Sequence, residues 1–227
     1  MYQGGRVSEG FAVDGVFCIS LSDRHDRRDI LRASLFQHFP DAEFLIVQRD
    51  QGDPQRGCFN SHQQCARMLV ERDWQRALIL EDDVMFYEIE PAHVRNINRY
   101  LTHYDPPIFY LGLILGRLWP TWSRGVVGCR ALGTHAYILN RNAASFVMAQ
   151  PYRGQGIDTM LKRCLPGRAA YPMLCQQQPD GLGKSDIDGE RDGSVAKCDE
   201  FWRRNKKRQR IEWRKNLWRL LIPAVWK

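Results

Sequence analysis

Apolar residues gather in short runs along the first 140 residues of this 227-residue chain. The runs that suit buried strands are residues 16–21, 44–47, 77–80, 109–115 and 136–139. Polar segments with a helical pattern follow the early runs. We expect one helix over residues 28–38, which ends before Pro40, and a second that is capped by Ser61 and ends near residue 72.

Two stretches have the composition of loops. Residues 50–57 are polar with Gly and Pro, and residues 118–130 are rich in Gly, Trp and Arg. Strands that alternate with helices predict an α/β fold, in which helices flank a mixed, mostly parallel sheet. Ligands of such sheets bind beyond the carboxyl ends of the strands. The polar clusters that follow the apolar runs are therefore the candidate sites.

Composition and charge divide the chain near residue 200. With 44% hydrophobic and 11% aromatic residues, the chain has the composition of a folded protein. Residues 201–227 hold ten Lys and Arg against one acid, a charge of +9, whereas residues 1–200 carry −2. We expect one domain over residues 1–200 and a basic tail over residues 201–227. The slightly acidic domain argues against a partner such as nucleic acid.

The tail mixes Trp, Leu and Ile with Arg and Lys. On a helix, Trp213, Leu217 and Leu220 share one face. This composition suits an amphipathic helix on an anionic membrane surface. It would also suit binding to the phosphate backbone of a nucleic acid. The third alternative is a solvated tail that docks on its own domain.

The cysteines and the amino terminus indicate a reducing compartment. Seven cysteines are scattered without a CxxC pair, so neither a zinc site nor a redox motif is indicated, and reduced, mostly buried thiols are expected. The segment MYQGGRVSEG lacks the features of a signal peptide, and no run of about 18 apolar residues occurs. We expect a cytoplasmic protein, or one peripheral on the inner face of a membrane.

Three acids, Glu81, Asp82 and Asp83, directly follow the apolar run 77–80. Carboxylates are ligands that Mg²⁺ and Mn²⁺ prefer, and an ion there could neutralise charge on a departing diphosphate. The same acids would suit a metal-dependent phosphohydrolase, a phosphoryl-accepting receiver domain or a solvated turn. A phosphohydrolase needs a nucleophilic Asp after the first strand, where Asp23 is the candidate.

The neighbouring motifs resemble glycosyltransferase family 25. GC-x-x-SH at residues 57–62, followed by ALILEDDVMF at residues 77–86, is similar to the family pattern. Further segments in the family's order are VFCISLSDRHDRR, YDPPIFYLG, GTHAYILNRNAA, GIDTML, YP and SDI. The resemblance covers residues 15–188. It departs at Ser20, where the family has Asn, and over residues 118–130, which match no family segment.

This family includes lipooligosaccharide and collagen galactosyltransferases. The resemblance implies a GT-A-like fold, a UDP-sugar donor (UDP-galactose first), inversion at the anomeric carbon and Mn²⁺ or Mg²⁺ as cofactor. A glycan or lipid-linked saccharide would be the acceptor, in lipopolysaccharide or lipooligosaccharide biosynthesis. A single displacement needs a base and an electrophile that stabilises the leaving diphosphate. For the electrophile, we expect Asp83 and Glu81 to hold the metal, with Asp82 as the substitute.

Asp158 is the predicted base. It stands at a predicted helix start behind Gly154 and Gly156, and an exposed Asp is ionised at neutral pH. From the residues alone, an ordinary helix cap is the alternative. Asp186 is the second candidate for the base.

Five further residues are predicted to contact the donor. Arg24 and Arg27 stand in the turn after the first strand and offer paired donors for phosphate, although a solvated helix start with Asp23 and Asp26 is equally consistent. His62 belongs to the GC-x-x-SH motif. The others are His135, which could reach the diphosphate or the metal, and Ser20.

Overall fold

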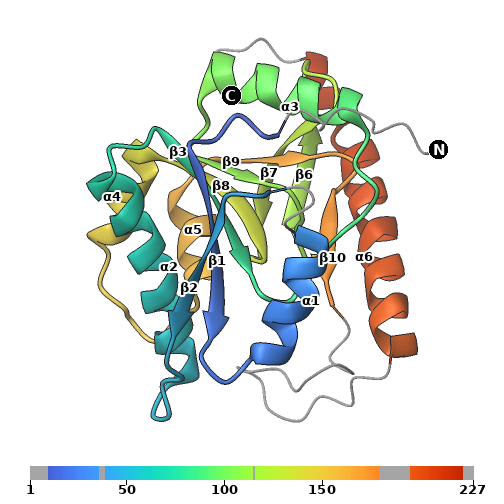
Figure 1. The fold of residues 1–227 in the computed structure, drawn as a ribbon. Helices are drawn as coiled ribbons and strands as arrows, with labels where there is room; N and C mark the ends of the chain where they lie inside the picture. Colours follow the sequence, from blue (N-terminus) through green and yellow to red (C-terminus); the bar gives the residue numbers. More distant parts are fainter. Residues whose placement is uncertain (1–9, 36–38, 115, 179–194, 222–227) are drawn as a thin grey trace, which may run out of the picture.

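The computed structural model describes residues 10–35, 39–114, 116–178 and 195–221. An eight-stranded sheet forms its centre, in the order β2-β1-β3-β8-β5-β9-β7-β6 (Figure 1). In that order the strands are β2 Ala42–Val47, β1 Gly15–Leu21, β3 Arg76–Glu81, β8 Ala136–Asn140, β5 Ile108–Tyr110, β9 Gly167–Ala170, β7 Val126–Ala131 and β6 Gly116–Pro120. A separate antiparallel pair joins β4 (Val84–Phe86) to β10 (Cys175–Gln177).

Helices cover both faces of the sheet (Figure 1). The helical segments are α1 His25–Leu35, α2 Pro54–Glu71, α3 Pro91–Tyr104, α4 Arg141–Met148, α5 Ile157–Cys164, α6 Val195–Lys215 and the 3-10 helix η2 Leu217–Leu221. Buried residues of α2, α4 and α5 pack into one hydrophobic core, and those of α1 and α3 pack into a second core. The sheet separates the two cores.

Most strands of the sheet run in one direction. β1 pairs in parallel with β2 and β3, and β5 pairs in parallel with β9. β8 and β7 run antiparallel to the strands beside them. The predicted α/β class with a mixed, mostly parallel sheet is confirmed.

β3 shows why the early strands are continuous apolar runs. Ala77 and Ile79 point into the core under α2, whereas Leu78 and Leu80 point into the core under α1 and α3. All four are fully buried. A strand that is covered on both faces has no solvent side for polar residues.

The second helix begins earlier than the sequence analysis predicted. Asp53 is the N-cap of α2, its side chain accepts from the backbone N–H of Arg56, and Pro54 occupies the first helical position. Asp before Pro is a strong start signal because the cap satisfies a free N–H and proline lacks one. Ser61 is therefore not the cap. It lies inside α2 and donates to the backbone oxygen of Gly57 over 2.8 Å.

The predicted loop over residues 118–130 is largely a β-hairpin. β6 and β7 pair antiparallel, and the connection between them includes Gly125 at φ +76°. Trp119 lies directly over Gly128, where a side chain would collide with the indole ring. The Gly and Trp that suggested a loop are thus complementary packing partners across two strands. The apolar run 109–115 contributes a strand only as far as Tyr110.

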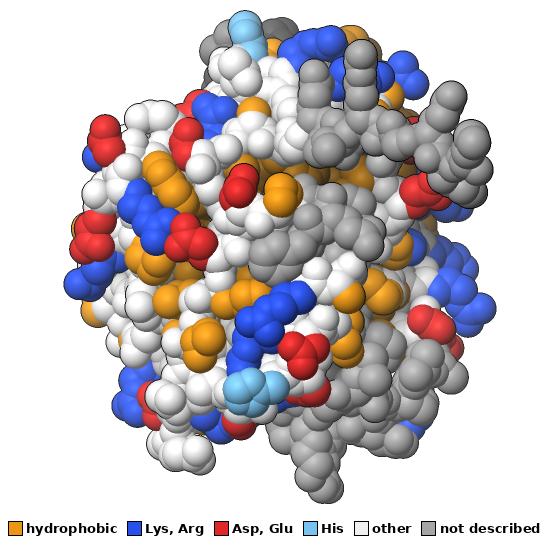
Figure 2. All heavy atoms as spheres, in the orientation of Figure 1, with side chains coloured by type: hydrophobic (Ala, Val, Ile, Leu, Met, Phe, Trp, Pro, Cys, Tyr) orange, Lys and Arg blue, Asp and Glu red, His pale blue; other side chains and the backbone are white. Residues whose placement is uncertain are grey.

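The basic tail belongs largely to a helix that packs on the domain. The predicted boundary between residues 200 and 201 falls inside α6, which lies beside β6. Trp202 is only 3% exposed, and the buried side chains of Asn205 and Gln209 donate to the backbone oxygen of Leu113 over 2.9 and 3.2 Å. Lys and Arg side chains gather at the edge of the molecule where α6 lies (Figure 2).

All seven cysteines are free, and four of them are buried: Cys18, Cys65, Cys129 and Cys175. Within the described residues, no helix has the length and apolar character needed to cross a membrane.

Candidate active site

The carboxyl ends of β1 and β3 lie side by side because the strands pair in parallel, with Ile19 opposite Glu81. The start of α1 therefore meets the turn formed by Asp82 and Asp83. Arg27 donates from Nη1 to Oδ1 of Asp82 over 2.9 Å, and the two side chains are only 10% and 8% exposed. A buried ion pair of this kind fixes the relative position of the two turns, since separating the charges would leave each one buried alone.

Glu81, the last residue of β3, is held by two side chains. Its Oε1 accepts from Oγ1 of Thr134 over 2.6 Å and lies 3.3 Å from Nε2 of His62. Burial acts to raise the pKa of Glu81, but the hydrogen bonds from His62 and Thr134 and the nearby His135 hold that pKa below its ordinary value of 4.5. Glu81 is therefore an ionised carboxylate with partners in the protein.

His62 is fully buried on α2, with both ring nitrogens directed at named groups. Nδ1 lies 3.0 Å from the hydroxyl of Tyr137 on β8, and Nε2 faces Glu81. The phenol and the carboxylate together fix the orientation of the ring. His62 therefore supports Glu81 from inside the core.

Cys58 lies one helical turn before His62 and close to the acids. Its Sγ lies within 4.8 Å of ligand atoms of His62 and Glu81. Burial raises the pKa of the Cys58 thiol, and the charges of Glu81, Asp158 and Asp83 raise it further. The Cys58 thiol therefore stays protonated at neutral pH.

His135 precedes β8 and is fully buried. Its ring packs edge-on against Trp202 at a centroid distance of 5.7 Å, and Gly112 approaches it so closely that no side chain fits there. Burial lowers the pKa of His135 to about 4, although Glu81 acts in the opposite direction. The ring is thus neutral at pH 7. Neither of its nitrogens has a hydrogen-bond partner among the described residues.

Asp82 and Asp83 form the turn between β3 and β4. Gln177 of β10 donates from Nε2 to Oδ2 of Asp83 over 3.2 Å, and the N–H of Gln178 donates to the backbone oxygen of Asp83 over 2.6 Å. Oδ2 of Asp82 is buried and has no hydrogen-bond partner in the described part of the chain. A buried carboxylate oxygen without a donor is costly unless a proton or a cation meets it. This oxygen is therefore a candidate ligand atom for a cation or an ordered water.

Arg28 organises the end of β1, a role that the sequence analysis missed. It is only 2% exposed and donates to Oγ of the buried Ser20 over 2.9 Å. It also donates to the backbone oxygens of Leu21 and Ser22. Ser20, a predicted donor contact, is thus bound to a side chain of the protein.

Arg24 stands just before α1 and is 8% exposed. Its Nε and Nη2 each donate to the carboxylate of Asp26 over 3.1 Å. This bidentate bond lowers the pKa of Asp26. The alternative to a donor contact, a helix start in which Arg24 accompanies Asp26, matches this pairing, although Arg24 is buried.

Asp158 is the second residue of α5, so the predicted helix start is confirmed within one residue, and Gly156 is the N-cap. Oδ1 of Asp158 accepts from the N–H of Thr159 over 2.6 Å. Asp158 lies near the first turn of α2, because a Cβ added at Gly156 would be 2.9 Å from its Oδ1 and 3.6 Å from Nε2 of Gln55. Asp186 lies outside the described residues.

The fold thus brings most of the predicted residues together at one edge of the sheet. The supporting residues that sequence reasoning missed are Arg28, Thr134, Tyr137 and Gln177. Thr134 and Tyr137 belong to GTHAYILNRNAA and Arg28 to the Arg-rich turn, so the motifs held a signal for these three. No motif marks Gln177, because its contact depends on the pairing of β4 with β10.

Residues 45–104 match the family model of glycosyltransferase family 25, which is described as an LPS biosynthesis protein. The family resemblance is confirmed over this segment. It contains α2 with the GC-x-x-SH motif, β3 and the three acids. The match supports a glycosyltransferase. No curated protein sequence matches the chain.

Three solved structures illustrate what the fold is similar to. A197 from STIV has 14% identity and a TM-score of 0.46, over 78% of this chain and 98% of that one. A UDP-glucose pyrophosphorylase complexed with UDP-glucose has 11% identity and a TM-score of 0.43, over 84% of this chain and 81% of that one. A glycosyltransferase involved in glycosylation of the major capsid of PBCV-1 has 10% identity and a TM-score of 0.42, over 84% of this chain and 99% of that one.

Proposed function

We propose that this protein is an inverting glycosyltransferase that moves a sugar, with galactose as the first candidate, from a UDP-sugar to a hydroxyl of a glycan or glycoconjugate. Lipopolysaccharide or lipooligosaccharide biosynthesis is the process that we propose for it. One observation carries the proposal. Arg27 meets Asp82, the neighbour of Asp83, at the carboxyl edge of the sheet, and Asp158 lies at the start of α5, near Gln55 in the first turn of α2. Inverting transfer needs this division between a charge-stabilising group and a base.

Mn²⁺ or Mg²⁺ is the proposed cofactor. The buried Oδ2 of Asp82 suits a hard cation, which carboxylate oxygens bind well. We place the ion on Asp82 and Asp83 because Thr134 and His62 already hold Oε1 of Glu81. This choice differs from the pair Glu81 and Asp83 that the sequence favoured. When bound, the ion would neutralise negative charge on the departing diphosphate.

Asp158 is the proposed base that accepts the proton of the acceptor hydroxyl. Its carboxylate stands at the amino-terminal end of α5, and the N–H of Thr159 fixes one of its oxygens. Arg24 and Arg27, each 8% exposed and paired with Asp26 and Asp82, are proposed to supply positive charge beside the phosphates of a donor.

The buried residues of the site are proposed to position others and not to touch the donor. His62 and His135 are fully buried beside Glu81, and Ser20 is 1% exposed and bound to Arg28. Each one has its polar contacts or its packing inside the protein. We therefore propose that these residues hold in place the edge of the sheet that carries Asp82 and Asp83.

Thermal-shift titration with UDP-galactose, UDP-glucose and UDP-N-acetylglucosamine, each with and without Mn²⁺, tests the donor and the metal. We expect one UDP-sugar to raise the Tm only when Mn²⁺ is present. Asp83→Asn should abolish that rise. Asp29→Asn should keep it, because Asp29 is 73% exposed on α1. If no UDP-sugar with metal raises the Tm, the proposal fails, and hydrolysis of phosphomonoesters would then favour the phosphohydrolase.

Asp158→Asn tests the base. The amide keeps an oxygen for the N–H of Thr159 but cannot take a proton. We expect transfer to fall by about 10²–10⁴-fold, the usual contribution of a general base, with UDP-sugar affinity unchanged. Retained transfer in Asp158→Asn together with its loss in Asp186→Asn would assign the base to Asp186.

We also propose that the end of the tail contacts an anionic membrane surface from the cytoplasmic side. Ile211, Leu217, Trp218 and Leu221 are between 40% and 84% exposed and alternate with basic residues. Exposed apolar side chains among cations suit the lipid interface.

Co-sedimentation with phosphatidylcholine vesicles, with and without phosphatidylglycerol, tests this contact. The double variant Leu217→Glu/Trp218→Glu should lose the binding that depends on phosphatidylglycerol. Trp122→Glu should keep it, since Trp122 is 76% exposed but lies on the β6–β7 hairpin. Equal binding by both variants would show that the tail does not contact the lipid.

A further inference from the structure

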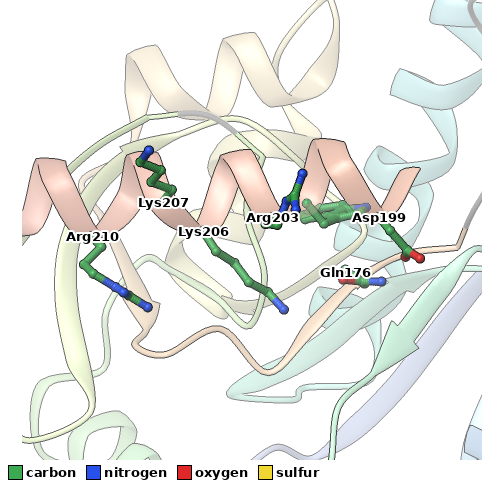
Figure 3. Close-up of a pocket in the computed structure, with 7 residues that line it drawn as sticks. Gln176, Asp199, Arg203, Lys206, Lys207 and Arg210 are labelled. Carbon is green, nitrogen blue, oxygen red and sulfur yellow. The ribbon is translucent and has the colours of Figure 1, made fainter. Parts of the chain in front are cut away.

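A groove of about 520 Å³ runs along α6 (Figure 3). Its size falls within the usual range of about 300–1,000 Å³ for ligand sites. The residues that line it are Gln176, Asp199, Trp202, Arg203, Lys206, Lys207 and Arg210. Six of them come from α6, and Gln176 comes from β10.

The charge of the groove is strongly positive. Arg203, Lys206, Lys207 and Arg210 contribute four cations against the single carboxylate of Asp199, a net charge of +3. Arg203 and Lys207, like Lys206 and Arg210, are spaced four residues apart, and Lys206 and Arg210 leave the helix on the same side (Figure 3). Like charges at this spacing repel one another on a helix. None of the four cations forms an ion pair with another described residue. An anion in the groove would relieve the repulsion.

Lys206 is held in place within the groove. Its Nζ lies 4.0 Å from the centre of the Tyr87 ring, a cation–π contact, and the loss of hydration there lowers its pKa. The hydroxyl of Tyr87 donates to Oε1 of Gln176. The groove therefore combines an oriented cation with a side-chain amide over a floor that includes the buried Trp202, and such groups suit a polar compound with a negative substituent.

The groove adjoins the proposed active site. Gln176 is followed by Gln177, whose side chain donates to Asp83. Tyr87 follows β4, the strand that begins one residue after Asp83. Trp202 also packs against His135, behind Glu81. A ligand in the groove would thus lie next to the carboxylates that face the donor.

We propose that this groove binds a phosphate- or carboxylate-bearing sugar of the acceptor glycan, an inference that rests on the proposed glycosyltransferase function. The groove's concave shape and its side-chain amide favour a sugar over a flat lipid surface. The position of the groove beyond Asp83, on the side away from the β1 turn, favours the acceptor over the diphosphate of the donor. Recognition of the charged sugar would hold a nearby hydroxyl at the site.

Direct binding of two matched probe pairs tests the proposal: glucose 6-phosphate against glucose, and sialyllactose against lactose. By NMR titration of the full chain, we expect the anionic member of each pair to bind at least about tenfold more tightly, because charge-assisted hydrogen bonds contribute about 1.5–3 kcal/mol. Lys206→Gln/Arg210→Gln should remove this preference. The control Arg95→Gln/Arg99→Gln makes the same charge change at the same spacing on the exposed side of α3 and should keep the preference.

Several results would overturn the proposal. Equal binding of anionic and neutral probes, or an equal loss in both double variants, would exclude a specific anion site. Displacement of glucose 6-phosphate by UDP would assign the cations to the donor. Unchanged probe binding in Lys206→Gln/Arg210→Gln, with weaker binding to phosphatidylglycerol vesicles, would assign them to lipid. Both double variants should keep UDP-sugar binding in the presence of Mn²⁺. If the unaltered protein itself shows no such binding, the proposed enzyme function is refuted, whatever the groove binds.

Discussion

Protonation of His135 should destabilise the folded protein as the pH falls below neutral. Burial lowers the pKa of this ring from 6.5 to about 4, whereas the unfolded chain keeps a value near 6.5. Between these two values the unfolded state binds more protons, so the free energy of unfolding decreases as the pH falls. The stabilisation is complete above pH 6.5 and is lost by about pH 4. Because each pKa unit is worth about 1.4 kcal/mol, the loss should approach about 3 kcal/mol.

Urea unfolding across this pH range, in the unaltered protein and in His135→Gln, measures the effect. The variant should show a shallower decline. His93→Gln measures the second contribution to the decline, because burial also lowers the pKa of His93 and that residue acts in the same direction. Glu81 acts in a different window: its folded pKa is lowered, so its stabilisation is present above its ordinary value of 4.5 and is lost below it.

A parallel decline in the unaltered protein and in His135→Gln would refute the reasoning. NMR provides a second test that needs no variant, since the ring resonances of His135 should stay constant from neutral pH down to about pH 5. A midpoint near 6.5 would show that the ring is accessible to water in the folded state.

Three further substitutions test the packing around the site. Trp202→Ala should lower the free energy of unfolding by about 3–5 kcal/mol in a urea titration, because the ring is 3% exposed, whereas Trp122→Ala at 76% exposure should change it by less than about 0.5 kcal/mol. Gly112→Ala should lower the Tm in a thermal melt, since its methyl group would collide with a buried imidazole and a backbone oxygen, and Gly10→Ala, in open space, should not. Arg28→Met should destabilise by about 1–3 kcal/mol in urea by leaving buried oxygens without donors, and an unchanged midpoint would contradict that role.

Local signals determined the early part of the fold. Continuous apolar runs marked β1, β3 and β8 because these strands are buried on both faces and need few polar residues, and a shorter run marked β2 at the edge of the sheet. The hairpin of β6 and β7 was missed for the opposite reason. Its Gly and Trp residues suggest turns when taken singly, and only the contact of Trp119 with Gly128 across two strands makes them sheet residues.

The sequence by itself determined which chemistry is present: three acids after a buried strand, an Arg-rich turn, a His in GC-x-x-SH and an Asp at a helix start. Only the tertiary structure decided which side chains each of these groups contacts. Glu81 turns inward to His62 and Thr134, while Asp82 meets Arg27 and has one buried oxygen without a hydrogen-bond partner among the described residues. Neighbouring carboxylates look alike in a sequence. Two of their partners, Thr134 just before β8 and Arg27 of α1, stand 53 and 55 residues away in the sequence, so these contacts depend on strand pairing that no local pattern specifies.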